Sequence, residues 1–292
     1  MAFNLSNLEK YVDEQRLPLI KKAVLGAKTI SLINLMTGVK RTSALNLLNT
    51  NPTLQAGGCG FSAQGDATLS QRLLNAENLK VNMEFCNKDL LSYWCAFETK
   101  ASAIGTDSVG FEQALISSLN ENINAKIEKL VWTGDKNNTG EFDGILTVLD
   151  GEAVKTATGT GAYEAIKATY EAIPVELLDK AVIFVGADTF RTAMMTMVEK
   201  NYYHYPADGS DIQEFVFPGT NTKVVAVNGL NGTNKVVASN PMNLFYGTDM
   251  LDDAETFEFF YDKGDRIWKF VCEFNGGAQV AYPNEVVIGT VA

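Results

Sequence analysis

The residue types that most often carry catalysis are sparse in this chain. His204 is the only histidine, and it lies in the aromatic run NYYHYP. General base catalysis usually falls to histidine, and one copy cannot build a hydrolytic triad or a multi-histidine metal site. We therefore interpret His204 as a surface or packing residue. The cysteines are Cys59, Cys86, Cys95 and Cys272. They form no CxxC pair, so we expect reduced thiols of a cytosolic protein.

Two segments resemble ligand-binding loops without completing them. Residues 135–143 follow the calcium-loop pattern, but Leu146 stands where a bidentate glutamate is required. We interpret this segment as an Asx/Gly turn. Residues 158–161 (TGTG) lack the Gly-Lys-Ser/Thr of a phosphate loop and have no closely preceding strand, so we interpret them as the start of a helix. We expect no catalytic, cofactor or metal site.

Length and composition indicate a globular protein with a sizeable core. The 292 residues suffice for one large domain or two modest ones, with 46% hydrophobic and 20% charged residues. No run approaches the ~18 consecutive apolar residues of a membrane span. The first residues, MAFNLSNLEKYVDEQ, lack the pattern of a secretion signal. We expect neither secretion nor membrane association.

The charge is divided unevenly along the chain. Residues 1–80 hold nine Lys/Arg against five Asp/Glu, a net charge of +4, and the remainder holds fifteen against thirty, a net charge of -15. A basic front on an acidic body suggests that the front contacts other copies of the body. Chance variation of solvated surface charge is the alternative. The whole chain is too acidic to bind nucleic acid by neutralising phosphates.

The segment 111–135 predicts a long amphipathic helix around which the other elements are arranged. Its apolar residues recur at spacings of three and four: Ile116, Leu119, Ile123, Ile127 and Leu130. Gly134 and Asp135 are expected to end the helix. A helix of some twenty residues is a rod of about 35 Å, long enough to organise a chain of this size.

A second unusual segment, residues 41–78, is rich in Asn, Thr, Gly, Ser and Gln. Nearly forty such residues are hard to fit as an internal loop of a compact domain. We therefore predict a two-stranded hairpin that projects from the body and satisfies its backbone by pairing. Gly57, Gly58 and Gly60 would lie at or near its tip.

The remaining segments predict a mixed α/β region followed by antiparallel strands. Short helices are expected at 3–15, 90–97, 162–172 and 188–200, the last capped by Asp188. Strands are expected at 29–36, 79–86, 181–186, 212–217, 223–228, 235–239, 256–261, 266–274 and 278–287. Hairpin turns at 262–265 and 275–277 would join the last three strands beneath the long helix.

This order of elements resembles the major capsid protein of tailed bacteriophages, the Hong Kong 97-type capsid fold. Three stretches carry the resemblance: LKVNMEFCNKDLLSYW at 79–94, IEKLVWTGDKNNTGEFDGILT at 127–147 and FVCEFNGGAQVAYPNEVVIGT at 270–290. Their order and spacing together are specific, and the resemblance covers most of the chain.

The resemblance implies an α+β fold with five parts. These are an N-terminal arm with the first strand (1–40), an extended E-loop hairpin (41–78), a P-domain with a spine helix at 111–133 and antiparallel strands (79–139), a mixed α/β A-domain (140–252) and the return strands of the P-domain (253–292). Some members join subunits through an E-loop lysine. No lysine lies between Lys40 and Lys80, so that bond is not expected here.

The implied function is structural, not enzymatic. Such a protein assembles into hexamers and pentamers of an icosahedral shell that encloses phage double-stranded DNA without sequence-specific binding. It would assemble in the cytoplasm of the bacterial host and reside in the virion, with a portal and a separate scaffolding protein as partners. The candidate inter-subunit contacts are basic residues of the front: Lys21, Lys22, Lys40, Arg41 and Arg72. The alternatives are an encapsulin shell protein and, more remotely, a soluble α/β enzyme or binding protein.

Overall fold

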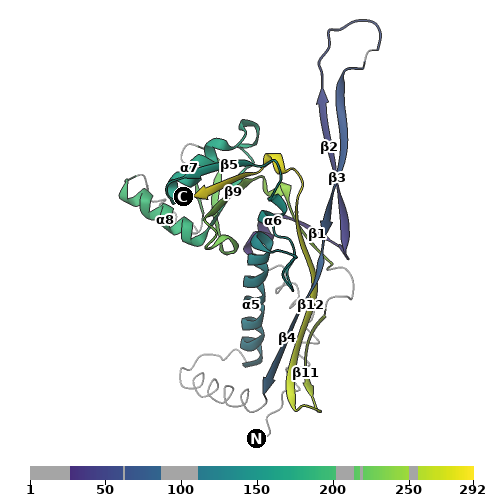
Figure 1. Ribbon diagram of the computed structural model, residues 1–292, viewed down its shortest axis with the longest axis vertical. Helices are drawn as coiled ribbons and strands as arrows, with labels where there is room; N and C mark the ends of the chain where they lie inside the picture. The colour runs from purple at the N-terminus through teal and green to yellow at the C-terminus, as the bar shows by residue number, and fades with distance from the viewer. Residues whose placement is uncertain (1–26, 62, 87–110, 202–213, 218–219, 250–255) are drawn as a thin grey trace.

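The computed structural model describes residues 27–61, 63–86, 111–201, 214–217, 220–249 and 256–292. Figure 1 shows a lobe of helices and strands, a long helix with strands running beside it, and a thin hairpin that projects away from both. The helices predicted at 3–15 and 90–97 lie outside the described residues, as do His204 and Cys95. The architecture is α+β.

The long helix α5 spans Phe111–Thr133, as predicted. The apolar stripe faces the interior: Ile116, Leu119, Ile123 and Ile127 are buried. At the end of the helix the N–H of Gly134 donates to Leu130 O at 2.9 Å. A Cβ at Gly134 would clash with the carbonyl oxygen of Phe142, so only glycine fits this exit. None of the helices in the described part of the chain has the length and apolar composition needed to cross a membrane.

A five-stranded sheet lies beside α5. Four strands follow the order β1-β10-β12-β11, and β4 also pairs with β12. Their bounds are Asn34–Thr37 for β1, Leu244–Thr248 for β10, Ile267–Val280 for β12, Thr256–Asp262 for β11 and Glu77–Cys86 for β4. Only β1 and β10 are parallel. Alternate residues of β12 enter the core shared with α5, among them Phe270, Cys272 and Phe274.

A six-stranded sheet forms the lobe, in the order β5-β13-β9-β6-β8-β7. The strands are β5 (Lys155–Gly159), β13 (Val287–Val291), β9 (Lys235–Ser239), β6 (Val182–Gly186), β8 (Lys223–Val227) and β7 (Glu214–Val216). The helices α7 (Ala162–Ala172) and α8 (Ala187–Glu199) share one core with this sheet, which includes Ile166, Phe190 and Val224. The other face meets the end of α5, where the rings of Trp132 and Phe184 lie 5.3 Å apart.

Several short elements complete the chain. They are α3 (Lys28–Leu32), α6 (Ile145–Leu149), and the 3-10 turns η1 (Val175–Leu177), η2 (Asn228–Leu230), η3 (Pro241–Asn243) and η4 (Pro283–Glu285). The projecting hairpin consists of β2 (Thr42–Pro52) and β3 (Gly65–Asn75). The prediction of helices at 162–172 and 188–200 and of most strands is confirmed within one or two residues.

The structure corrects four local predictions. Residues 29–36 were expected as one strand, but they form α3 followed by β1. Asp188 was expected to cap α8, whereas Gly186 is the N-cap. The Asp188 carboxylate accepts hydrogen bonds from the N–H groups of Thr189 and Gly232. Residues 158–161 were expected to have no strand close before them, but β5 runs through Thr158 and Gly159, and α7 begins after Gly161. The strand β10 was missed altogether because its LFYGT sequence is short and interrupted by glycine.

The largest correction concerns residues 275–277, which were expected to form a turn. They lie inside β12, which continues to Val280, and the final strand β13 then pairs with β5 and β9 in the six-stranded sheet. Gly277 pairs with Gly247 of β10. A Cβ at Gly277 would clash with the carbonyl oxygen of Asn75, and one at Gly247 with the side chain of Leu74. Because neither glycine has a side chain, residues 74–76 at the end of β3 can cross this part of the sheet at close range.

A buried polar network ties α3 to α5. Glu128 on α5 is 4% exposed, and its carboxylate accepts hydrogen bonds from the backbone N–H of Thr29, at 2.9 Å, and from the Thr29 hydroxyl. Trp132 Nε1 donates to the same hydroxyl oxygen at 2.8 Å. Burial raises the pKa of Glu128 above its usual value, although hydrogen bonds from Thr29 and Gly229 and the charge of Lys28 act in the opposite direction.

We expect Glu128→Ala to lower the free energy of unfolding by about 1–3 kcal/mol, because it leaves the buried N–H and hydroxyl of Thr29 without an acceptor. Glu128→Gln keeps an acceptor and removes the titration. Since the folded pKa lies above the unfolded value, the contribution of Glu128 is fully present below the unfolded pKa and is lost as pH rises through the folded pKa.

Chemical denaturation of the wild type and Glu128→Gln at several pH values measures this effect. The wild type should gain stability relative to the variant as the pH falls through the folded pKa toward the ordinary value of 4.5. A difference that is constant with pH would show that Glu128 does not titrate with folding.

The glycine patch gives a second stability prediction. We expect Gly277→Ala to lower the free energy of unfolding by about 2 kcal/mol or more, because the new methyl group meets backbone atoms that cannot move aside. Gly276→Ala is the matched control, since its Cβ would meet only the Tyr246 hydroxyl and the edge of the Phe142 ring. Thermal and denaturant unfolding compare the two variants, and equal losses would contradict the proposed crossing.

Candidate functional site

The calcium-like loop is closed by its own side chains. The backbone N–H of Asn137 donates to Asp135 Oδ1 at 2.9 Å, which confirms the predicted Asx turn. Lys136 Nζ lies 2.9 Å from Asp143 Oδ2, and Glu141 accepts a hydrogen bond from the N–H of Asp135. Within the described ranges, no three His, Cys, Asp or Glu side chains gather as a metal site would require.

Three cysteines fall among the described residues, and none of these three is in a disulfide bond. Cys272 is buried in the core, whereas Cys86 is exposed at the end of β4 and Cys59 is exposed in the segment that joins β2 to β3. The described residues therefore offer no cluster of catalytic or metal-binding groups. The candidate functional site is the projecting hairpin β2–β3 and its attachment to the body.

The hairpin β2–β3 is a two-stranded antiparallel ribbon, as predicted. Its register pairs Thr42 with Asn75 at the base and Pro52 with Gly65 at the outer end. The tip comprises residues 53–64 and contains the predicted glycines, of which Gly60 has φ +115°. Over the described residues, β2 and β3 form a sheet of their own. Figure 1 shows the ribbon extending well beyond the sheets of the body.

The two faces of the hairpin have different surroundings. We define the inner face by Leu45 and Leu74, which are buried, and by Arg72, which is partly buried. We define the outer face by Leu48, Leu69 and Leu73 together with Asn46 and Gln71. The outer leucines are exposed by 58%, 83% and 54%. Direct pairing of Leu48 with Leu69 and of Asn46 with Gln71 places these residues on one face.

Apolar contacts hold the hairpin base to the body. Leu74 is fully buried in a small core with Val39 and Ala76, and Met36 and Phe245 pack against it. This core lies over Gly247 of β10, so the absence of a side chain there is what admits Leu74. The hairpin base is thus clamped between β1, β10 and β12.

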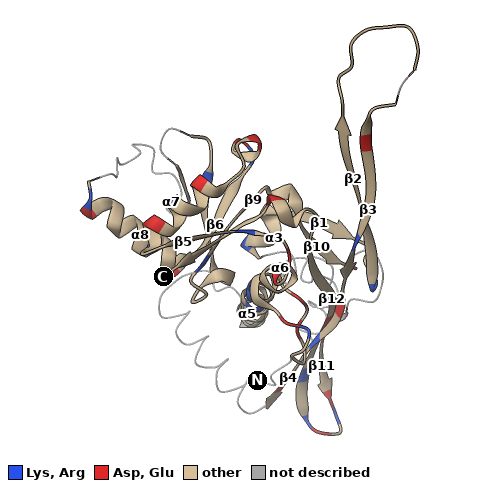
Figure 2. Cartoon of the chain, turned by 45° about the horizontal axis from the view of Figure 1, so that its top comes forward, with Lys and Arg blue, Asp and Glu red and all other residues tan. Residues whose placement is uncertain are grey.

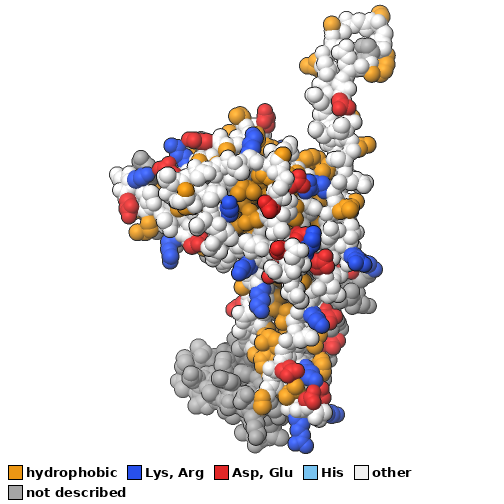
Figure 3. Space-filling model, viewed as in Figure 1, with side chains coloured by type: hydrophobic (Ala, Val, Ile, Leu, Met, Phe, Trp, Pro, Cys, Tyr) orange, Lys and Arg blue, Asp and Glu red, His pale blue; other side chains and the backbone are white. Residues whose placement is uncertain are grey.

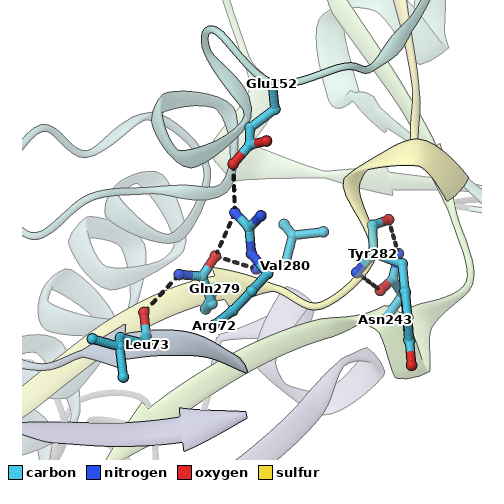
Figure 4. Close-up of polar contacts among 7 residues, drawn as sticks. All are labelled: Arg72, Leu73, Glu152, Asn243, Gln279, Val280 and Tyr282. Carbon is cyan, nitrogen blue, oxygen red and sulfur yellow. Dashed lines mark hydrogen bonds and ion pairs between the residues drawn. The ribbon is translucent and has the colours of Figure 1, made fainter. Parts of the chain in front are cut away.

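Polar contacts also hold the hairpin base, next to the apolar ones (Figure 4). Arg72 Nη2 lies 2.8 Å from Glu152 Oε1 and 3.5 Å from Gln279 Oε1. Gln279 Nε2 donates to the carbonyl oxygen of Leu73 at 2.7 Å. These bonds link β3 to β12 and to the segment that follows α6, which fixes the direction in which the hairpin leaves the body.

The end of β12 is itself held by Asn243 of η3. Its side-chain amide donates to the carbonyl oxygen of Tyr282 at 2.9 Å and accepts from the N–H of Tyr282 at 2.7 Å (Figure 4). This paired bond joins the chain leaving β12 to the turn that enters β10. The Asn243–Tyr282 hydrogen bonds therefore fix the end of β12 close to Gln279, the residue that contacts the hairpin base.

Three of the five basic residues predicted as contacts lie among the described residues, and their role as contacts stays a prediction. Lys21 and Lys22 lie outside the described residues, and Lys40 and Arg41 are exposed at the hairpin base. Arg72 is engaged with Glu152 of its own chain. Sequence analysis missed Glu152 and Gln279, which are 80 and 207 residues away from Arg72, and no local pattern marks either of them.

Charge is distributed over the body and nearly absent from the hairpin. Between residues 42 and 75 the sequence contains two charged residues, Asp66 and Arg72. The charge-coloured views show acidic and basic side chains scattered over the body and very few along the ribbon (Figures 2 and 3). The predicted positive front therefore does not extend onto the projecting part of the hairpin.

Comparison with known proteins gives a likeness of fold. No protein-family model and no curated protein sequence matches the chain. The chain is similar to a solved structure of the satellite phage P4 procapsid including the size determination (Sid) protein, with 11% identity, a TM-score of 0.62, and coverage of 100% of this chain and 92% of that chain.

Two further solved structures show the same likeness. The capsid of the empty GTA particle matches with 12% identity and a TM-score of 0.59, covering 93% of this chain and 90% of that one. A virus-like particle from Pyrococcus furiosus matches with 11% identity and a TM-score of 0.53, covering 94% and 97%. Nearly complete coverage in both directions means that the whole architecture is shared, not one lobe. The chain therefore has the fold of bacteriophage-type capsid proteins, the Hong Kong 97-type capsid fold.

Proposed function

We propose that this protein is a structural major capsid protein that self-assembles into hexamers and pentamers of an icosahedral shell enclosing phage double-stranded DNA. The observation that carries the proposal is the match of nearly the whole chain to capsid structures at only 11–12% identity. The projecting hairpin supports it, because a ribbon with open faces and edges is expected in a protein that contacts other copies of itself.

The structural elements support an assignment of the parts of the fold. We assign β2–β3 as the E-loop, α5 as the spine helix, α5 with β4, β11 and β12 as the P-domain, and the six-stranded sheet with α7 and α8 as the A-domain. The boundaries 41–78, 79–139 and 140–252 are those that the resemblance implies. Residues 253–292 are divided, since β11 and β12 lie beside α5 whereas β13 pairs within the six-stranded sheet.

The proposal includes partners and location. The main partner is the protein itself, with a portal and a separate scaffolding protein during assembly in the cytoplasm of the bacterial host, and the final location is the virion. A net charge of -11 suits a container, because an acidic body encloses DNA without binding it tightly. The N-terminal arm, residues 1–40, would carry Lys21 and Lys22 to neighbouring subunits.

Negative-stain electron microscopy of the purified protein, with size-exclusion chromatography alongside, tests the proposal. We expect closed shells, tubes, or separate hexamers and pentamers, either from the protein alone or after co-expression with the neighbouring genes. A monomer that stays monomeric at high concentration, with crowding agent and with the neighbouring gene products present, would contradict the proposal.

A charge-swap experiment tests the part that Arg72 plays. We expect Arg72→Glu to reduce the yield of shells without unfolding the subunit, because a carboxylate facing Glu152 releases the hairpin base from its set direction. The isolated ion pair is worth only about 1 kcal/mol or less, so thermal stability should change little. Adding Glu152→Arg to the same chain should restore the yield.

The outcome separates two roles for Arg72. Restored assembly in the swapped double variant indicates that the ion pair acts within one chain, as the structure has it. Failure of the swap, together with normal folding of both variants, would favour the sequence-based prediction that Arg72 contacts a neighbouring subunit. Arg191→Glu, at an exposed position of α8 and outside the predicted contacts, is the control for a general effect of charge.

A second candidate function is the shell of a protein-storing compartment, an encapsulin. The match to the virus-like particle from Pyrococcus furiosus favours it, because that likeness supports a shell without specifying phage DNA as its content. Analysis of purified native particles decides between the candidates. Nuclease-protected double-stranded DNA supports the phage capsid, whereas a packaged enzyme encoded by an adjacent gene supports the encapsulin.

A further inference from the structure

Three segments of the chain meet at one buried carboxyl group, that of Glu128 on α5. From α3, the backbone N–H of Thr29 donates to Glu128 Oε2 at 2.9 Å, and the Thr29 hydroxyl donates to the other carboxylate oxygen. From η2, the backbone N–H of Gly229 also donates to the carboxylate. Gly229 lies so close to this turn of α5 that a Cβ there would clash with the backbone carbonyl oxygen of Glu128. Glu128 therefore joins α3 and η2 to the C-terminal turns of α5.

The surroundings of Glu128 disfavour its ionised form. Glu128 is 4% exposed, and its neighbours Thr29 and Trp132 are fully buried. Lys28 acts on the carboxylate from α3, whereas η2, α6 and the residues one turn away on α5, Asn124 and Trp132, bring no charged group. Burial raises the pKa of Glu128, and the hydrogen bonds and Lys28 offset this only in part. Ionisation inside the closed joint is therefore costly, and the cost is relieved when water reaches the carboxylate.

Of the elements at this joint, α3 is the one that can open. It has five residues, Lys28–Leu32, and its N-cap Ala27 makes no side-chain hydrogen bond to the backbone. So short a helix is not stable by itself, and α3 therefore depends on its contacts with α5. By contrast, η2 connects β8 and β9, which are both paired within the six-stranded sheet. The strand β1, which follows α3, is paired with β10 along its whole length, so an opening of α3 would end at β1.

We propose that Glu128 is a proton-controlled latch for α3: the joint is closed while the carboxyl group carries a proton, and α3 separates from α5 more often once the group is ionised. The closed joint binds the proton more tightly than the open one, in which water solvates the carboxylate. The latch is therefore tightest below the ordinary value of 4.5 and loosens as the pH rises through the raised folded pKa. It lies within one subunit, so it operates whether or not the protein forms shells.

Hydrogen–deuterium exchange of the purified protein, measured by mass spectrometry on a peptide covering residues 28–33, tests the latch. After correction for the intrinsic pH dependence of exchange, protection of this peptide should fall as the pH rises, by at most about tenfold per pH unit because one proton is released. Protection should level off above the folded pKa. Glu128→Gln keeps the shape of the side chain but cannot titrate, so its protection should not change with pH. Glu121→Gln, at an exposed position of α5, is the matched control and should keep the wild-type slope.

Two further comparisons separate the latch from a merely structural contact. Thr29→Val removes the hydroxyl and leaves the titrating group, so we expect lower protection at every pH with the slope retained. A peptide from α7, which belongs to the other core, should show no slope in the wild type. Wild-type protection of residues 28–33 that is constant with pH would overturn the proposal, whether or not Glu128→Gln folds. A Glu128→Gln protein that keeps the wild-type slope, or an equal slope in the α7 peptide, would also overturn it.

Discussion

The close crossing of the hairpin base over β12 is the constraint on which this structure depends. Gly277 and Gly247 pair across two strands and leave room for the backbone of residues 75 and 76 and for the buried Leu74. The strand β12 at this crossing also pairs with β4, β10 and β11, so the same element organises the sheet beside α5 and sets the origin of the hairpin. A side chain at Gly277 would therefore disturb both the pairing of β12 in this sheet and the packing of the hairpin base against it.

The residues that stabilise the folded subunit lie in the body, whereas the projecting hairpin contributes few of them. The body has two large cores, one around α5 and β12 and one around α7, α8 and the six-stranded sheet, and these hold the subunit together. The hairpin beyond its base contributes little to either core. Its leucines are therefore available for contacts between molecules, where apolar burial that is not used in folding can stabilise an assembly. In the proposed shell, many weak contacts of this kind would add up through its closed symmetry.

Within the described residues, charge lies at the base of the hairpin and is nearly absent from its projecting part. The excess of basic residues before residue 80 indicated an arm laid on acidic neighbours, yet the projecting ribbon is nearly neutral. Arg72, the single basic residue within β2–β3, is bound to Glu152 beside Gln279. Its ion pair with Glu152 ties β3 to the segment after α6, so this charge contributes to how the hairpin base is held within the chain.

The sequence by itself determined the elements that have a local cause. The spacing of Ile116, Leu119, Ile123 and Ile127 predicts α5, and the glycine-rich, uncharged segment 41–78 predicts a projecting hairpin, because helix periodicity and chain reach are local properties. The fold class and its resemblance to capsid proteins followed from the order of these elements. The assignment of the hairpin as an E-loop and the domain boundaries remain predictions.

Only the tertiary structure decided what Gly276 and Gly277, Arg72 and Thr29 do. A glycine pair normally indicates a turn, but here Gly277 lies within a strand and leaves space for the backbone of residues 75 and 76, two hundred residues away. Residues 29–36 change from a predicted strand to a helix and a strand, with Thr29 bonded to Glu128 and Trp132 on α5. Such contacts join residues that are distant in sequence, so their energies depend on the packed arrangement and leave no trace in local propensity.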